Sequence, residues 1–298
     1  MSGPPRTNGI DIRRYPEAGA GEETPMSVNT MVCGIVLHPA GHTRSPAMHN
    51  AAFRACGIDA TYQAFDVPPD RLGDAIAGMR GLGLRQLAVS IPHKTTVMAH
   101  LDRVDERAAA IGAVNTVTLR GNKLEGANTD WIGALRALER EIDPKGRHAV
   151  VLGAGGAARA VVYGLGQAGA QVSILNRTES RARELATELG AKESGPLEAL
   201  ADLSPDIIIN TTSVGLGSDV SPAAPEWLPA HAVVMDAVYQ PENTRLLRDA
   251  AQRGARALPG KWMLVHQAAE QFRLWTNTDP PLDVMAQAFD AAGRDSSS

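Results

Sequence analysis

Four polar residues in the first half of the chain are of the types that proton transfer requires. Lys94, Asn115 and Asp130 each lie on a short apolar, strand-like segment, and Asn128 precedes the aspartate by two positions. A lysine ammonium can give a proton to a carbonyl oxygen that gains negative charge, provided that the two groups lie within about 3 Å. A carboxylate beside the lysine orients it and favours its charged form, whereas burial favours the neutral form. The set predicts a polar pocket in which a proton is transferred, with Asp130 also expected to cap the helix that follows it.

A glycine-rich turn follows downstream. Residues 150–158 have the pattern of a strand that enters a turn and opens a helix, with Gly153, Gly155 and Ala158 in the three small positions of G-x-G-x-x-G/A. Missing side chains let the backbone approach a pyrophosphate, and the helix N-terminus offers free N–H groups. The turn predicts a dinucleotide site. Together with the polar pocket, it indicates a dehydrogenase that acts on a small hydroxylated substrate.

The residues after the next strand distinguish between the two nicotinamide cofactors. A site for NAD usually has an aspartate or glutamate about 20 residues beyond the glycines, which binds the ribose 2′-hydroxyl. This chain has Asn176, Arg177 and Thr178 there, with Arg181 one turn later. No carboxylate repels a 2′-phosphate, and Arg177 can stack on adenine while its charge meets the phosphate. NADP is the predicted cofactor.

The elements that must position these residues alternate between strands and helices, which predicts an α/β protein. Strands are expected at 31–37, 61–67, 86–91, 114–119, 123–126, 148–152, 171–175, 206–210 and 232–236. Helices are expected at 45–55, 70–79, 104–111, 131–142, 157–167, 180–189, 244–252 and 263–274, the last of which is expected to fold back onto the first unit.

Composition excludes several classes of partner. The 298 residues carry a net charge of −4, and only 4% are aromatic, so neither a basic surface nor stacking platforms for nucleic acid are expected. No apolar run approaches the length that spans a bilayer.

Cys33 and Cys56 each lie in an apolar stretch and are expected to be reduced core residues. Residues 1–29 lack the apolar centre of a secretory signal, so we expect a disordered extension on a cytoplasmic protein.

In order along the chain, these segments resemble the shikimate dehydrogenase (shikimate/quinate 5-dehydrogenase) family, from about Met31 to Trp275. The matching runs are 42–46, 49–50, 91–94, 112–116, 128–130, 153–157, 176–178, 210–215, 239–241 and 260–267. The resemblance implies an N-terminal α/β substrate domain, a Rossmann-type NADP domain and an active site in the cleft between them. It implies domain boundaries at 30–129 with 263–291 for the substrate domain and 130–262 for the NADP domain, leaving residues 292–298 as a frayed tail.

The resemblance also implies roles for individual residues in the reversible reduction of 3-dehydroshikimate to shikimate by NADPH. Lys94 and Asp130 match the family's catalytic pair. The substrate-binding positions are Thr43 and Ser45, whose hydroxyls would hold the substrate carboxylate, with Ser90, Asn115, Tyr239 and Gln267. The cofactor-binding positions are Gly153, Ala154, Gly155, Gly156, Ala157, Asn176, Arg177, Thr178, Arg181 and Gly260.

Three positions depart from the family's usual residues. Thr43 stands where serine is usual, Ala88 where asparagine is usual, and Ser90 where threonine is usual. If the missing amide faced the pocket, its unsatisfied partner would cost roughly 1–3 kcal/mol. The departures suggest that substrate preference has drifted, so a quinate or aminoshikimate dehydrogenase is an alternative.

A non-catalytic sensor of NADP(H) and a shikimate-like acid is an alternative from another class, although it would be expected to lose Lys94 or Asp130. His38, His42 and His49 lie close together in the sequence, but no cysteine or acidic partner completes a metal site, and none is expected. The expected partner is a small-molecule substrate, and the chain is expected to be a monomer or a homodimer.

Overall fold

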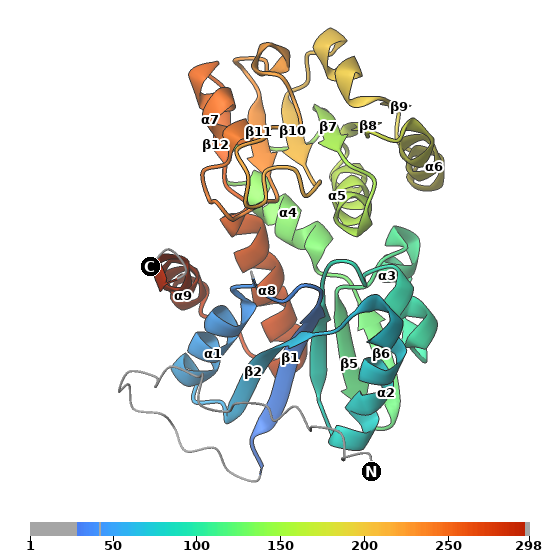
Figure 1. Cartoon of the computed structure of the whole chain (residues 1–298), viewed down its shortest axis with the longest axis vertical. Coiled ribbons are helices and arrows are strands. Elements are labelled where there is room, and N and C mark those ends of the chain that lie inside the picture. The colour runs from blue at the N-terminus through green and yellow to red at the C-terminus, as the bar shows by residue number, and fades with distance from the viewer. Residues whose placement is uncertain (1–28, 42, 296–298) are drawn as a thin grey trace, which may run out of the picture.

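The computed structural model describes residues 29–41 and 43–295. Two lobes, each built around a six-stranded sheet, lie one above the other in Figure 1. Residues 1–28 of the extension expected at 1–29, together with His42 and the last three residues, lie outside the described residues. In the described ranges no helix is both long and apolar enough to cross a bilayer, and the longest, α8, has 16 residues.

The first sheet has the strand order β2-β1-β3-β5-β6-β4. Strands β2, β1 and β3 are parallel, β5 is antiparallel to β3 and β6, and β4 is parallel to β6. The bounds are β1 Met31–Leu37, β2 Ala60–Asp66, β3 Gln86–Val89, β4 Arg103–Val104, β5 Thr116–Arg120 and β6 Lys123–Ala127. The expected hairpin between residues 114 and 126 is therefore confirmed as β5 and β6.

Helices from both ends of the chain complete this lobe. They are α1 Ser45–Ala55, α2 Leu72–Leu82, α3 Glu106–Ile111, α8 Lys261–Thr276 and α9 Leu282–Asp295. The apolar core packs Phe53 of α1 against Phe272 of α8 and Phe289 of α9, all with almost no exposed surface. The prediction that the helix at 263–274 returns to the first unit is confirmed.

The second sheet is fully parallel, with the strand order β12-β11-β10-β7-β8-β9. Counted along the chain from β7, this is the order 3-2-1-4-5-6 of a Rossmann fold, which confirms the predicted fold class. The elements are β7 His148–Leu152, α5 Gly156–Gln167, β8 Gln171–Leu175, α6 Glu179–Leu189, β9 Glu193–Gly195, β10 Ile207–Asn210, β11 Val233–Asp236, α7 Arg245–Gln252 and β12 Arg256–Leu258. The strand order reverses between β7 and β10, where such folds bind their ligands.

The chain passes between the lobes through two helices, α4 Asp130–Leu138 and α8, which pack against one another. They touch at Gly133, where a Cβ atom would lie 2.7 Å from Gln267 Cβ and 2.8 Å from the Met263 carbonyl oxygen. Only a glycine permits this approach, and it brings Gln267 to the start of α4.

The structure corrects the sequence expectations at three places. Helix α4 ends at Leu138 rather than at residue 142, and Asp130 is its first residue, so the expected cap is wrong and Thr129 holds that position. Helix α9 was not predicted, and it continues through Asp295, beyond the point where fraying was expected to begin. The short strands β4, β9 and β12 were also not predicted.

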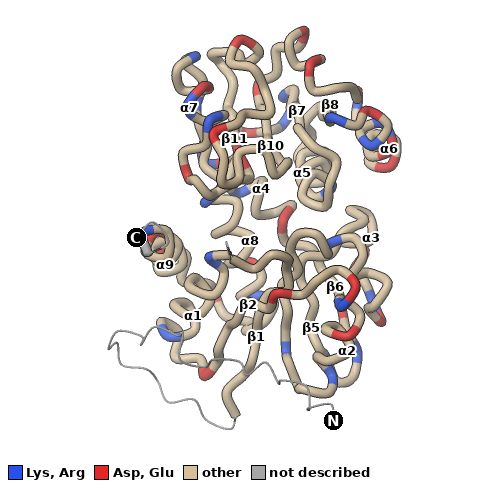
Figure 2. The backbone as a smooth tube through the Cα atoms, in the orientation of Figure 1, with Lys and Arg blue, Asp and Glu red and all other residues tan. Residues whose placement is uncertain are grey.

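Charged residues of both signs are intermixed over the two lobes in the view of Figure 2. In the described part of the chain, neither sign is confined to one lobe in this view.

Candidate active site

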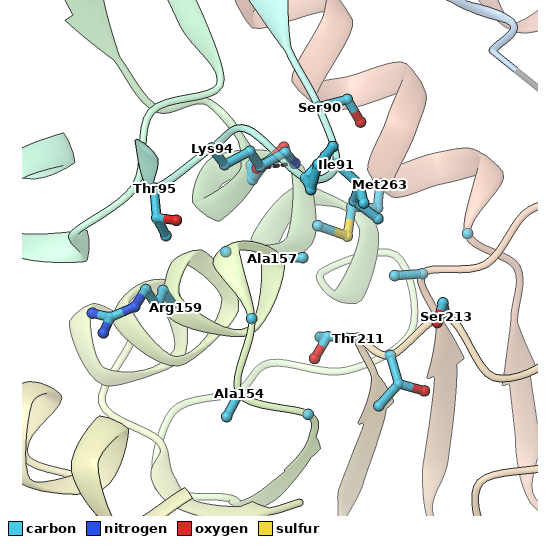
Figure 3. A pocket seen from close by; sticks show the side chains of 18 of the residues that line it. Ser90, Ile91, Lys94, Thr95, Ala154, Ala157, Arg159, Thr211, Ser213 and Met263 are labelled. Carbon is cyan, nitrogen blue, oxygen red and sulfur yellow. Dashed lines mark hydrogen bonds and ion pairs between the residues drawn. The ribbon is translucent and has the colours of Figure 1, made fainter. Parts of the chain in front are cut away.

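A cleft of about 900 Å³ lies between the two lobes and is lined by residues from both (Figure 3). Of the residues predicted to form the site, the following line it: Thr43, Ser45, Ser90, Lys94, Asp130, Gly153, Ala154, Gly155, Gly156, Ala157, Asn176, Arg181, Tyr239, Gly260 and Gln267. Three do not line it, namely Asn115, Arg177 and Thr178. The cleft thus brings together most of the residues that the sequence singled out, from segments far apart in the chain.

Lys94 and Asp130 form an ion pair at the wall of the cleft. Lys94 Nζ lies 2.7 Å from Asp130 Oδ2, and the two side chains are only 15% and 5% exposed. The turn after β3 carries Lys94, whose backbone carbonyl accepts a hydrogen bond from the Val114 N–H at 2.7 Å. Asp130 lies at the N-terminus of α4, where the helix dipole favours a negative charge. Backbone structure therefore fixes the positions of the two residues that carry these charges.

Asn115 orients the aspartate. Its Nδ2 donates to Asp130 Oδ1 at 2.8 Å and to Thr129 Oγ1 at 2.9 Å, and it lies 3.3 Å from Gln267 Oε1. Its Oδ1 accepts the Thr129 N–H at 2.8 Å. Asn115 is buried, and it contacts Asp130 of the ion pair without lining the cleft. Its expected contact with substrate stays a prediction.

The remaining predicted substrate residues converge on the cleft from three elements. Thr43 and Ser45 lie at the N-terminus of α1, with the Ser45 N–H 3.3 Å from Thr43 Oγ1. Ser90 follows β3, and Tyr239 lies in the loop after β11. Ala88, by contrast, packs in the apolar core of the first lobe. Two of the three departures from the family's usual residues therefore reach the cleft, and the third does not line it.

The glycine turn between β7 and α5 forms the opposite wall. Gly153 has φ of +115°, and a Cβ there would lie 2.7 Å from Thr211 Oγ1. A Cβ on Gly156, the first residue of α5, would lie 3.0 Å from Lys94 Cβ. Side chains at these positions would fill the space that a pyrophosphate needs, so the turn fits a dinucleotide. The contact also places Lys94 directly against the predicted cofactor site.

The residues after β8 fit NADP. Asn176 and Arg181 line the cleft, and Asn176 Nδ2 donates to the Thr178 carbonyl at 2.9 Å, which shapes the turn into α6. Arg177 and Thr178 are exposed beside this turn. Their roles as cofactor contacts stay predictions.

A second buried carboxylate, which the sequence did not single out, lies at the end of β11. Asp236 accepts hydrogen bonds from Asn210 Nδ2 at 2.8 Å, Thr244 Oγ1 at 2.7 Å and the Val238 N–H at 3.0 Å. Burial raises the pKa of Asp236 to about 6, although these hydrogen bonds oppose the shift. Asn210 also accepts from Thr212, a cleft residue, at 2.7 Å. The cluster ties together the loops that follow β10 and β11.

Comparison with known proteins identifies the family. Family models described as "Shikimate dehydrogenase substrate binding domain", "Shikimate / quinate 5-dehydrogenase" and "Shikimate 5'-dehydrogenase C-terminal domain" match residues 35–117, 136–216 and 260–288. The curated shikimate dehydrogenase (NADP(+)) of Symbiobacterium thermophilum is 48% identical over 276 residues, which cover 88% of this chain and 94% of the relative. The chain belongs to the shikimate dehydrogenase family.

Solved structures of shikimate dehydrogenases share the arrangement of both lobes. A crystal structure of a shikimate dehydrogenase in complex with NADP+ matches with a TM-score of 0.87 and 39% identity, covering 92% of this chain and 99% of that chain. The shikimate dehydrogenase of Thermus thermophilus in complex with NADP(H) and shikimate matches with a TM-score of 0.83 and 39% identity, covering 88% and 99%.

Several cleft residues of this shikimate dehydrogenase family member were not found from the sequence. Thr211 follows β10 at the reversal of strand order; it lies in the run 210–215 that resembles the family, but no role was predicted for it. Arg159 of α5 donates to the Ile111 carbonyl at 3.3 Å and to Glu188 Oε2 at 2.6 Å, and so links the two lobes. The sequence offered one signal for Arg159, which is its position four residues after Gly155, the second glycine of the turn.

Proposed function

We propose that this protein is an NADP-dependent shikimate dehydrogenase, which reversibly reduces 3-dehydroshikimate to shikimate with Lys94 and Asp130 as its acid–base pair. The observation that carries the proposal is the position of this ion pair, which lies in the wall of the cleft and against the glycine turn at Gly156. A non-catalytic sensor would have no need of a lysine and an aspartate held 2.7 Å apart at this place.

Lys94 is the proton donor in this proposal. NADPH, when bound, supplies the hydride that the carbonyl carbon receives. The carbonyl oxygen then gains negative charge, and the Lys94 ammonium stabilises that charge and transfers a proton to it. In the reverse direction the neutral lysine takes the hydroxyl proton. Asp130 keeps the ammonium in place and Asn115 keeps Asp130 in place, so little reorganisation is needed at the moment of transfer.

The substrate and cofactor occupy opposite parts of the cleft. Thr43 and Ser45 hold the substrate carboxylate at the N-terminus of α1, while the glycine turn of residues 153–157 holds the pyrophosphate and Arg181 the 2′-phosphate. We assign residues 30–129 with 263–291 to the substrate domain and 130–262 to the NADP domain. Support comes from the sheets, since β1 to β6 lie in one lobe and β7 to β12 in the other.

The test is kcat/KM for shikimate and for quinate, each with NADP+ and NAD+, measured by nicotinamide absorbance. We expect shikimate with NADP+ to be preferred. Quinate is the competing acid because Thr43 and Ser90 both line the cleft and both differ from the family's usual residues. Preference for quinate would overturn the substrate assignment and leave the acid–base roles standing. Absence of turnover with all four pairs would overturn the proposal.

A further inference from the structure

Arg44 is a buried cation placed between two residues that are predicted to bind the substrate carboxylate. It is the N-cap residue of α1, and only 9% of its surface is exposed. Its neighbours Thr43 and Ser45 line the cleft, whereas its own side chain packs against α9, with Cζ 4.3 Å from the centre of the Phe289 ring.

Among the described residues, no carboxylate pairs with Arg44. Its Nε is buried without a hydrogen-bond partner, and in the described part of the chain the guanidinium makes ring contacts but no ion pair. One carboxylate of α9, Asp290, binds Lys261 Nζ at 2.6 Å and 2.8 Å. Burying an unpaired charge is costly, and a cation–π contact offsets only part of that cost.

The Arg44 charge lies near a residue of the cleft wall. Arg44 Cζ lies 5.9 Å from the centre of the Tyr239 ring, and Tyr239 lines the cleft. Burial raises the pKa of the Tyr239 hydroxyl, and the Arg44 cation opposes that shift. The N-terminus of α1 adds a positive dipole at the same place. An anion bound to Thr43 and Ser45 would lie where both fields are positive.

Helix α9 holds the guanidinium in position. A Cβ on Gly293 would lie 2.8 Å from Arg44 Cζ, so the guanidinium lies close against the helix at this glycine. Phe289, one turn earlier, contacts Arg44 and also packs on Tyr239, with ring centres 5.8 Å apart. The helix therefore supports two sides of the substrate end of the cleft.

We propose that Arg44 is a specificity-determining residue, whose buried charge selects substrates that carry a carboxylate at the Thr43 and Ser45 end of the cleft. The inference rests on the proposed function, which supplies the acid. Arg44 acts through space, and it needs no contact with the substrate.

The experiment compares wild type, Arg44→Met and Arg44→Lys, with shikimate and its uncharged methyl ester as substrates. Arg44→Met keeps an unbranched, flexible side chain and removes the charge. We expect kcat/KM for shikimate to fall about tenfold in this variant. A charge several ångströms from the substrate carboxylate, in a partly screened site, contributes an interaction energy of this order. The ester should change less than about twofold, the KM for NADP+ should stay constant, and Arg44→Lys should recover most of the loss. Thermal melting checks that the variants fold.

The outcomes separate the charge from the packing of Arg44. Equal losses for acid and ester, or no loss for the acid, would overturn the inference while leaving the proposed function in place. A wild-type protein that does not oxidise shikimate would overturn the proposed function itself, and the inference with it.

Discussion

Two buried aspartates, Asp130 at the junction of the lobes and Asp236 in the second lobe, have nearly the same surroundings. Asp130 accepts from Asn115 Nδ2 at 2.8 Å through one oxygen and from Lys94 Nζ at 2.7 Å through the other. In the second lobe, Asp236 accepts from Asn210 Nδ2 at 2.8 Å and from Thr244 Oγ1 at 2.7 Å. The main difference is that a lysine in one cluster is replaced by a threonine in the other.

That difference is the basis for the roles that we propose for the two aspartates. Lys94 gives Asp130 a charged partner, and both residues line the cleft. Asp236 has neutral donors only and does not line the cleft, so burial raises its pKa to about 6 and its hydrogen bonds fix two loops. A buried carboxylate therefore indicates catalysis only when a titratable partner and an open path to ligand accompany it.

The largest expected effect is the loss of the lysine from the first cluster. Lys94→Ala should lower kcat by at least about a thousandfold with little change in the KM for NADP+, because proton transfer contributes about 10²–10⁴-fold and the ammonium also stabilises the alkoxide. Steady-state kinetics with shikimate checks this. Lys192→Ala, at an exposed lysine of the second lobe, is the matched control and should turn over normally. An active Lys94→Ala enzyme would remove the chemical distinction between the clusters.

Removing the charge of Asp130 should have the next largest effect. Asp130→Asn keeps the shape but gives the lysine an uncharged partner, and we expect kcat to fall by about 10²–10³-fold. Steady-state kinetics with shikimate, at the same pH for variant and wild type, is the measurement. A normal rate would show that Asp130 only shapes the helix terminus.

The equivalent change in the second cluster should affect stability rather than rate. The pKa of Asp236 rises from 3.8 to about 6 on folding, so the folded state holds its proton more tightly. This raises the free energy of unfolding by at most about 3 kcal/mol below pH 4. The contribution is lost as the pH rises to 6. Asp236→Asn cannot titrate and should not show this loss.

Urea unfolding between pH 4 and pH 7 measures this pH-dependent contribution of Asp236 to the free energy of unfolding. The stability of Asp236→Asn relative to wild type should increase across this range, whereas kcat with shikimate should remain within a few-fold of wild type. Parallel pH dependences in the two proteins would contradict the raised pKa. A large fall in kcat would contradict the supporting role.

The smallest expected effect comes from Thr244, the counterpart of Lys94. Thr244→Val removes the hydroxyl that donates to Asp236 and accepts from the Leu247 N–H, and it should reduce the free energy of unfolding by about 1 kcal/mol. Thr244→Ser keeps the hydroxyl and should have nearly the wild-type free energy of unfolding. Urea unfolding of the wild type and both variants measures this. If the valine and serine variants are equally stable, the hydroxyl does not hold the cluster.

The two clusters also differ in how far the sequence predicts them. Lys94 and Asp130 could be found because each stands beside an apolar strand in a run that resembles a known family. The pairing of Asn210 with Asp236 depends on the register of β10 against β11, where the two residues are direct partners. Register between parallel strands joined by a long connection is set by packing of the whole lobe, which no local pattern reveals.

Elements were predicted well where the apolar pattern was long and poorly where it was short. The Rossmann strands β7, β8, β10 and β11 are mostly apolar runs of four or five residues and were found, whereas β9 and β12 have three residues each and were not. Strand β4 has only two residues, which is too few to show a period. Helix α9 had a usable signal, since Met285, Ala286 and Phe289 have helical spacing and all are buried. The contact between Arg44 and Gly293 of this helix could not be predicted without the structure.

The position of α8 and α9 has a consequence for how the protein is made. The first lobe packs Phe53 against Phe272 and Phe289, yet those two residues are synthesised after the whole second sheet. During translation, the early part of the chain therefore leaves the ribosome with one side of its core uncovered, while the later Rossmann lobe has all of its strands available first. The lobe that begins the chain is the one that finishes folding last.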